Sequence, residues 1–99
     1  MALTKETVVD KIEILEMGQV QIRIATRVLE DGVALSQSFH RRVLEPSVKN
    51  DGSWSDTDIS GEDARVQAVA TATWTAEVKI AYQEMVNAQI QRVENAQTI

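Results

Sequence analysis

The segment VQIRIATRVLEDGV, residues 20–33, decides the fold. Apolar residues and one threonine occupy every second position from Val20 to Val28, and this period of two predicts a strand buried on one face. Asp31–Gly32 follows, a pair typical of two-residue type I′ turns, because both central residues of such a turn need positive φ. The chain is therefore expected to return as an antiparallel strand over about residues 33–45.

The register of this hairpin follows from the length of its loop. If Asp31 and Gly32 alone form the loop, Glu30 lies opposite Val33. The apolar residues of the two strands then pair with one another: Val28 with Leu35, Ile24 with Phe39, and Val20 with Val43. All of them would lie on one face, so the hydrophobic pattern favours this register.

A strand over about residues 6–16 precedes the strand at about 19–29, and two kinds of turn would join them. A two-residue loop, Met17–Gly18, would leave the isoleucines of the first strand on the polar face of the second. A three-residue loop, residues 16–18, gives Gly18 the left-handed position of a bulged turn. It pairs Ile14 with Val20 and Ile12 with Ile22. We prefer the three-residue loop, because it makes the three strands an up-and-down meander with one apolar face.

A long polar connection is expected after the third strand. Pro46 ends that strand, because proline has no N–H to donate to the sheet. Residues 46–59 are polar and longer than a typical loop, which often indicates a function or a partner. Trp54, their one aromatic residue, either folds back over the edge of the core or anchors a neighbouring chain.

The remaining residues show helical spacing and predict two helices, at about 61–73 and 76–95. Ser60, with Asp63 three residues later, resembles a capping box at the start of the first helix. Thr75 and the acidic turn after it predict a new N-cap for the second helix. The polar tail, residues 91–99, is expected to fray unless a partner holds it.

Together these elements predict a single α+β domain over residues 1–99. A three-stranded antiparallel meander is followed by two helices that pack on one face of the sheet. A chain of 99 residues supports one modest core. Its four aromatic residues leave that core mostly aliphatic, which suits a thin sheet-and-helix layer better than a deep ligand cavity.

Composition and charge argue against several functional classes. The absence of cysteine rules out disulfides, thiolate zinc sites and a cysteine nucleophile. The longest apolar runs are only a few residues, too short for a membrane span. The net charge of −5 comes entirely from residues 51–99, and an acidic helical half weighs against binding to nucleic acid or anionic membranes.

The candidate chemical motifs are incomplete. His40, the single histidine, has no partner at the spacing of a catalytic or metal-binding pair. Residues 56–61 match the first half of a calcium loop, but Gln67 stands where the closing bidentate glutamate belongs. We therefore assign no catalytic residue, cofactor or metal ligand, and we expect a protein that is not an enzyme.

The solvent side of the meander is the most informative surface. The register above places a group of basic residues there: Lys11, Arg23, Arg27, His40 and Arg42. This face is either an ordinary charged sheet surface or a docking site for a protein, including a second copy of the chain. Nucleic acid ranks last, since no aromatic stacking platform accompanies the charges. With Trp54, these residues form the candidate interface.

The chain also resembles small proteins encoded by tailed bacteriophages. The resemblance rests on KETVVDKIE at residues 5–13, EDG at 30–32, SFHRRV at 38–43 and TAEV at 75–78. It covers most of the chain and implies a phage origin and a place in the virion, with no catalytic residue to carry over. We therefore expect a structural or accessory protein of a phage particle, made in the host cytoplasm and acting in capsid decoration or tail/fibre attachment. The alternative is a small intracellular regulator or adaptor that binds one host or phage protein.

Overall fold

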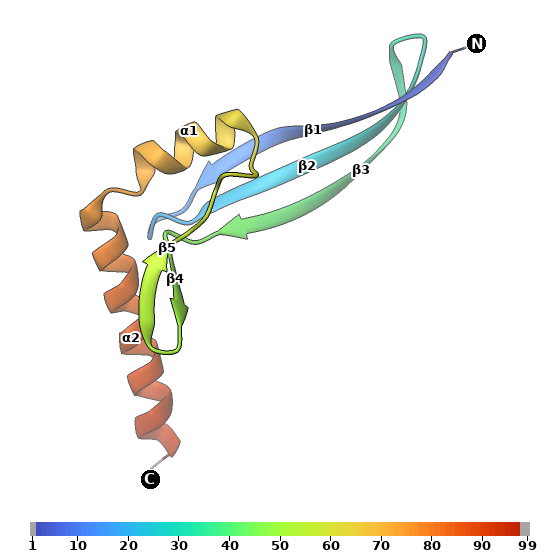
Figure 1. Cartoon of the computed structure of the whole chain (residues 1–99). Coiled ribbons are helices and arrows are strands. Elements are labelled where there is room, and N and C mark those ends of the chain that lie inside the picture. Colours follow the sequence, from blue (N-terminus) through green and yellow to red (C-terminus); the bar gives the residue numbers. More distant parts are fainter. Residues whose placement is uncertain (1, 98–99) are drawn as a thin grey trace.

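The chain folds as an α+β domain in which a three-stranded antiparallel sheet precedes two helices, as predicted (Figure 1). The computed structural model describes residues 2–97, and the side chains of residues 2–90. The strands of the main sheet are β1 (Leu3–Ile14), β2 (Val20–Glu30) and β3 (Val33–Leu44). A second sheet and the helices follow: β4 (Ser47–Asn50), β5 (Ser53–Asp56), α1 (Ala64–Thr73) and α2 (Ala76–Gln97).

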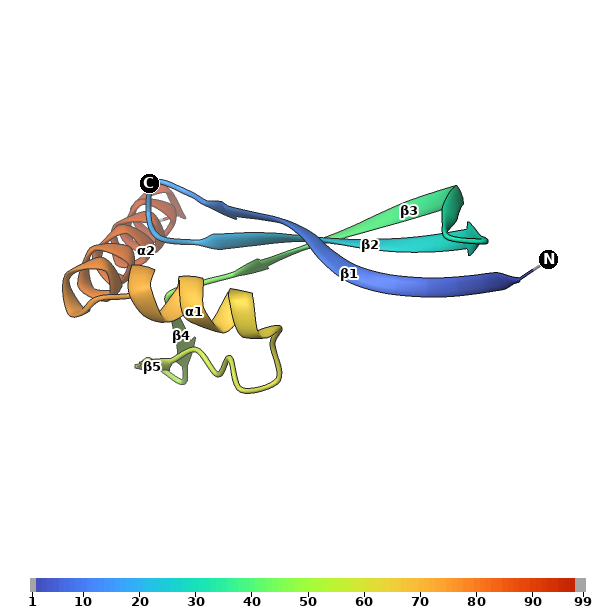
Figure 2. The same cartoon turned by 90° about the horizontal axis from the view of Figure 1, so that it is seen from above.

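The molecule is strongly elongated. Its principal extents are 65 × 32 × 23 Å, and its radius of gyration is 18.4 Å. A globular domain of this length would have a radius of gyration of roughly 13 Å. Figures 1 and 2 show the reason: the helices and the small sheet gather at one end of the main sheet, and the other end projects freely. We call the covered end, residues 9–14, 20–24 and 40–44, the base, and the free end, residues 3–8 and 25–39, the arm.

The first turn confirms the three-residue loop. Ile14 lies opposite Val20, and the backbone N–H of Leu15 donates to the carbonyl of Gln19 at 2.8 Å. Gly18 has φ +87°, the left-handed conformation that the bulged turn requires. Further along, a β-bulge at Asp10 shifts the pairing by one residue. The alternating pattern had not indicated this bulge.

The predicted register of the second hairpin was wrong beyond its first two pairs. The type I′ turn itself is present, with φ +50° at Asp31 and +85° at Gly32. A bulge at Leu35 then adds one residue to β3. The observed pairs are Val28 with Ser36, Ile24 with His40, and Val20 with Leu44. Because side chains alternate with a period of two, this one-residue shift moves all of β3 beyond the bulge to the opposite face.

The expected polar connection at 46–59 contains a second hairpin. Strands β4 and β5 pair antiparallel around Asp51–Gly52, whose φ values are +51° and +83°. The same turn signal stands at Asp31–Gly32, but here the flanking strands have only four residues each and no run of alternating apolar residues. Without that alternation the sequence did not distinguish a short hairpin from a loop.

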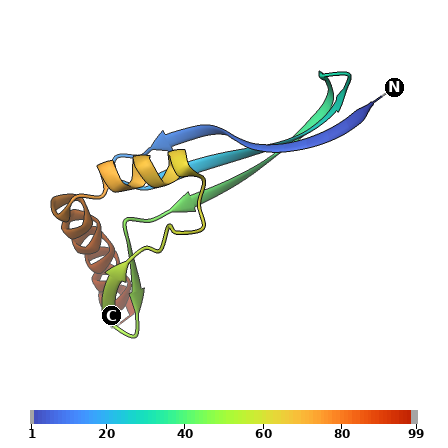
Figure 3. The same ribbon diagram turned by 45° about the horizontal axis from the view of Figure 1, so that its top comes forward.

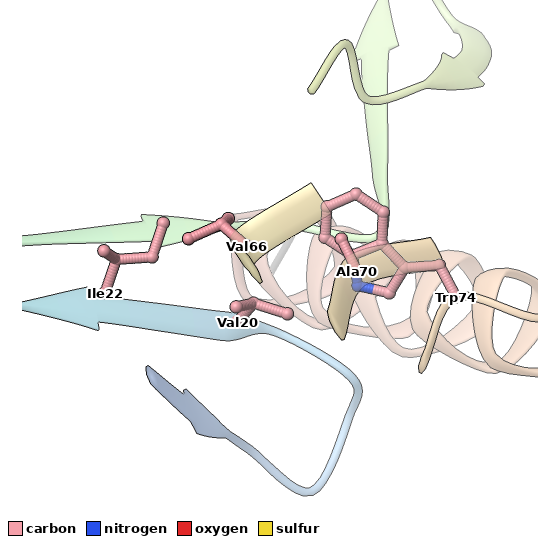
Figure 4. Close-up of a cluster of buried hydrophobic side chains, with 5 residues drawn as sticks. All are labelled: Val20, Ile22, Val66, Ala70 and Trp74. Atoms are coloured by element: carbon pink, nitrogen blue, oxygen red, sulfur yellow. The ribbon is translucent and has the colours of Figure 1, made fainter. Parts of the chain in front are cut away.

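The hydrophobic core joins α1 to the base of the sheet. Its buried members come from β2, from α1 and from the junction between the helices: Val20, Ile22, Val66, Ala70 and Trp74 (Figure 4). Partly buried residues complete it, among them Ile12, Ile24 and Leu44 of the sheet and Val78 of α2. The core therefore ends near Ile24, and α1 does not reach the arm.

Two caps define the helices, one predicted and one not. Thr75 caps α2 as predicted, its Oγ1 accepting a hydrogen bond from the N–H of Val78 at 3.3 Å. The N-cap of α1 is Asp63 rather than Ser60, because the Asp63 carboxylate accepts from the N–H of Arg65 at 2.8 Å. The N–H of Ser60 instead donates to Asp58 Oδ1 at 2.9 Å in a local turn, so α1 begins later than expected.

The second helix packs on the main sheet only at its start, where Val78 contacts the core, and the rest of the helix leaves the sheet face on which both helices were predicted to pack. Figure 3 shows α2 turning away from α1 and running beside the β4–β5 hairpin. Gln83 Nε2 donates to the buried Ser47 hydroxyl at 3.2 Å, and Lys79 pairs with Asp56 at 2.9 Å. The helix continues to Gln97 through most of the tail that was expected to fray, and residues 98–99 of that tail lie outside the described residues.

Candidate interaction surface

The outer face of the main sheet is the side opposite α1. Val20 and Ile22 point into the core beneath α1, so the alternate residues of β2 and their cross-strand partners point the other way. In Figures 1 and 2 no described element lies across this side. The outer face consists of rows that cross the three strands: Glu6–Arg27–Gln37, Val8–Ala25–Phe39, Lys11–Arg23–Arg41 and Glu13–Gln21–Val43.

One of these rows is apolar throughout. Val8, Ala25 and Phe39 lie side by side across the arm, next to the base. Ala25 is fully buried, whereas the Phe39 side chain remains 50% exposed. The Arg23 guanidinium lies over the Phe39 ring at 4.4 Å from its centroid, a cation–π contact that holds the ring against the sheet. An exposed aromatic ring held in place by arginine has the chemistry of an interface hot spot.

Ion pairs flank the apolar row on both sides. Arg23 binds Asp10 through two hydrogen bonds of 2.8 and 3.0 Å. Arg27 binds Glu6 at 3.0 Å. The hydrogen bonds from Arg23 lower the pKa of the Asp10 carboxyl, because they favour its charged form.

The charges on the outer face are divided by strand. The carboxylates, Glu6, Asp10 and Glu13, all come from β1. The guanidinium groups, Arg23, Arg27 and Arg41, come from β2 and β3. Lys11 is the one cation that β1 adds, and it pairs with Glu13 at 2.7 Å, which lowers the pKa of that carboxyl. Arg41 forms no ion pair with any of the side chains that the structure describes.

The structure brings together three of the six residues of the candidate interface. Lys11, Arg23 and Arg27 lie on the outer face, as expected. His40 and Arg42 were placed there wrongly: the bulge at Leu35 puts them on the α1 side, opposite Ile24 and Ile22.

Arg42 has a structural partner on the α1 side. It forms two hydrogen bonds to Glu62, of 2.6 and 3.2 Å, in the segment that leads into α1. These bonds favour the charged form of Arg42 and raise its pKa. Because Arg42 is on β3 and Glu62 precedes α1, the pair links the edge of the base to the start of the helix. The expected basic surface is therefore smaller than predicted and is largely neutralised by carboxylates.

Trp54 lies far from these residues along the chain, on β5, and packs against α2. Its ring meets Tyr82 edge-on, with centroids 6.1 Å apart. Lys49 lies over the same indole at 5.6 Å from its centroid. Burial, together with the nearby Glu45 carboxylate, raises the pKa of Tyr82 to about 12. Trp54 thus folds back within the chain, onto the hairpin–helix layer rather than onto the core of the main sheet.

The sequence reasoning missed Asp10, Phe39 and Arg41 as members of this surface. Phe39 was assigned to the buried face, because alternation without a bulge placed it opposite Ile24. Asp10 reaches Arg23 only because the bulge in β1 turns its side chain to the outer face. The sequence does contain a weak signal for this surface, since acidic residues lie on one strand and basic residues on its neighbours. That signal identifies the surface only when the register of the strands is known.

The acidic stretch at 56–61 is engaged in contacts within the chain. Asp56 pairs with Lys79, and Asp58 accepts the N–H of Ser60. Across the described side chains, no three His, Asp or Glu residues gather closely enough to hold a metal ion. Within residues 2–97, no helix has the length and apolar character that crossing a membrane requires. No protein-family model, curated protein or solved structure matches this chain.

Proposed function

We propose that this protein is a non-enzymatic structural or accessory subunit of a tailed-bacteriophage particle and that it docks onto other protein chains through its arm. The observation that supports this proposal is the shape of the arm. It projects from the base as a single layer of sheet within a molecule 65 Å long. Capsid decoration and tail or fibre attachment are both roles for such a subunit.

A bare sheet layer needs a partner on physical grounds. Sheets are stable when a second layer covers their apolar side, and α1 supplies that layer only at the base. The end of the arm exposes large apolar side chains, with Leu3 60%, Val33 65% and Leu35 56% exposed. Together with Phe39, these are four of the nine exposed large apolar residues among the described side chains. Exposed apolar groups on a projecting element are typical of a protein–protein contact.

The resemblance to small phage proteins supports the choice of particle. Two of its segments contribute to the arm: residues 5–13 form most of β1, which runs from the arm into the base, and residues 30–32 form the turn at the tip of the arm. Residues 75–78 begin α2, at the junction with the base. The similar segments therefore include part of the arm and its terminal turn, and the segment at 38–43 continues from the arm into the base.

Mass spectrometry of purified particles tests the proposal directly. We expect the chain in purified particles at a fixed stoichiometry to the other structural proteins. A double variant of the arm tip, Val33→Glu with Leu35→Glu, should fold but be lost from particles. Ile80→Glu is the matched control, since Ile80 is 54% exposed on α2 and lies outside the arm. Finding the chain only in the lysate of infected cells would overturn the proposal and favour the intracellular regulator.

A further inference from the structure

We infer that β3 accepts an extended, acidic segment of another protein, which adds to the free edge of the main sheet along residues 36–41. This inference rests on the proposed docking function and names the chemistry of the partner. Three observations support it: only one of the two sheet edges is open, the main-chain groups of that edge are unbonded, and its charge is positive and partly unpaired.

The two edges of the main sheet differ in their protection. The bulge at Asp10 interrupts β1, and Arg65 of α1 donates a hydrogen bond to the main-chain carbonyl of Val9. The strand also contains two lysines, and lysines and bulges both hinder the pairing of an edge strand. By contrast, β3 contains neither lysine nor proline, and its pairing with β2 is regular over residues 36–44. The open edge is therefore that of β3.

The edge of β3 is also uncovered. Residues 33–41 are all exposed. Figures 1 and 2 show no described element beside the arm portion of β3 on the side away from β2. A long, uncovered edge strand offers main-chain donors and acceptors to another chain.

The register shows which main-chain groups face this edge. Directly before β2 the carbonyl of Gln19 accepts from the N–H of Leu15 at 2.8 Å, and directly after β2 the N–H of Asp31 donates to the carbonyl of Ala2 at 3.0 Å. The odd-numbered residues of β2 therefore bond towards β1, and the even-numbered residues bond towards β3. The β3 residues opposite the odd-numbered ones are Gln37, Phe39 and Arg41. Their N–H and C=O groups point to the free edge.

These outward main-chain groups are available to an added strand. Within the part of the chain that the structure describes, no hydrogen bond from another segment reaches them. The side chains of the same three residues lie on the outer face of the sheet. A strand that bonds to the edge therefore also brings its own alternate side chains beside Phe39 and Arg41.

The charge of β3 indicates the chemistry of the added strand. The strand contains two arginines and no carboxylate. Arg42 is bound by Glu62, whereas Arg41 forms no ion pair with the described side chains. A carboxylate beside Arg41 would supply a partner, because cross-strand pairs of opposite charge stabilise a sheet. An apolar residue two positions away, on the same face, would cover the half-exposed Phe39 ring.

The edge strands of a second copy fit this edge poorly. A second β3 brings no carboxylate to Arg41 and adds two more arginines. A second β1 is acidic, but its edge is interrupted by the bulge at Asp10 and by the bond from Arg65 to Val9. The expected occupant is therefore an acidic segment of another protein.

Amide hydrogen exchange of the full chain, followed by NMR, tests the strand addition. The probe is a short peptide in which threonine alternates with valine and glutamate in turn, so that valine and glutamate share one face. At millimolar concentration it should slow exchange at Gln37, Phe39 and Arg41 by about tenfold. Ser38 and His40, which bond to β2, should change little. The same peptide with every backbone nitrogen methylated cannot donate to β3 and should give no protection.

Charge-reversed variants test the preference for an acidic partner. Arg41→Glu should weaken binding of the glutamate peptide by about tenfold and should favour a peptide with lysine in place of glutamate. Lys5→Glu is the matched control, because Lys5 is exposed on β1, at the other edge of the sheet. It reverses the same charge and should leave binding of the glutamate peptide unchanged. Far-UV circular dichroism of each variant establishes that it is folded.

The outcomes separate this inference from the proposed function. Unprotected β3 amides with the glutamate peptide, or equal protection by the lysine or the methylated peptide, overturn the inference. Protection without peptide that rises with protein concentration assigns the edge to a second copy and also overturns it. If strand addition occurs as described but the chain is absent from purified particles, the particle role fails and the strand addition stands. If the chain is present in particles but adds no strand, only this inference fails.

Discussion

The base and the arm belong to the same three strands, yet they differ in almost every physical respect. In the base, Val20 and Ile22 are completely buried beneath α1. In the arm, the same strands continue with Leu3 and Val33 more than half exposed. Backbone pairing is continuous through both regions, with β2 hydrogen-bonded on both sides along its length.

The difference shows that strand pairing and burial are separate properties of this sheet. Hydrogen bonding between strands builds the arm without help from a second layer, but burial of apolar area stabilises only the base. The base therefore carries most of the stability of the single chain. The apolar side chains of the arm are exposed in the single chain, and a partner that covered them would bury them.

The largest expected effect is loss of a core side chain from the base. Ile22→Ala should lower the free energy of unfolding by about 3 kcal/mol, because it removes fully buried atoms and leaves a cavity. Val33→Ala in the arm should change it by less than about 0.5 kcal/mol. Urea denaturation followed by circular dichroism, at one protein concentration, measures both. Similar losses at the two sites would contradict the division into base and arm.

Two glycines, one in a turn at the base and one in the turn at the tip of the arm, allow the packing of the two regions to be compared directly. Gly18 at the base and Gly32 at the tip of the arm both have positive φ, of +87° and +85°. A Cβ at Gly18 would also lie 2.4 Å from Val78 Cγ1, whereas nothing lies within 4 Å of one at Gly32. Gly18→Ala should therefore cost about 3 kcal/mol, from strained backbone and overpacking together.

Gly32→Ala should cost about 1 kcal/mol, because only its backbone conformation is affected. Thermal unfolding of the two variants gives the comparison. Equal shifts in midpoint would mean that Val78 gives way and that the base is not tightly packed at this turn.

A smaller effect is expected at the start of α1, the helix that covers the base. Asp63→Ala should cost about 1 kcal/mol, because it removes the N-cap acceptor for the N–H of Arg65. Ser60→Ala, at the position where the capping box was expected, should have almost no effect. Chemical denaturation of the two variants decides which residue caps the helix, and a larger loss from Ser60→Ala would reverse the assignment.

The smallest effect concerns the acid sensitivity of the outer face. Because Arg23 lowers the pKa of Asp10 below its ordinary 3.8, the folded chain holds this carboxylate ionised more readily than the unfolded chain does. The contribution of the pair is present above that value and is lost as the pH falls through the lowered pKa. Asp10→Asn should thus flatten the dependence of unfolding free energy on pH at acid pH. Parallel curves for the two proteins would show that the pair adds nothing.

Much of the fold was predictable because it depends on local signals. Gly18 and Asp31–Gly32 mark turns through the backbone angles they tolerate, and Thr75 marks a helix start through its side chain. The hairpin at Asp51–Gly52 carried the same local signal and was missed, because its short strands lack apolar alternation.

The candidate surface was only half predictable, because it depends on two bulges. A single extra residue, at Asp10 or Leu35, changes little locally but moves every following side chain to the other face. Alternation alone favoured the unbroken register, in which Phe39 is buried. In the folded chain Leu44 joins the core and Arg42 reaches Glu62, contacts that exist only with the bulge.

The sequence by itself determined where the main sheet turns, which three strands pair in it and where the second helix begins, since each of these follows from a few adjacent residues. The tertiary structure decided which face of β3 meets the core, where α2 packs and how far the core extends along the sheet. Those features depend on contacts between residues distant in the chain, such as Trp74 Nε1 donating to the carbonyl of Gly18 at 2.7 Å. No local pattern encodes such contacts, because their free energy exists only once the separate elements have come together.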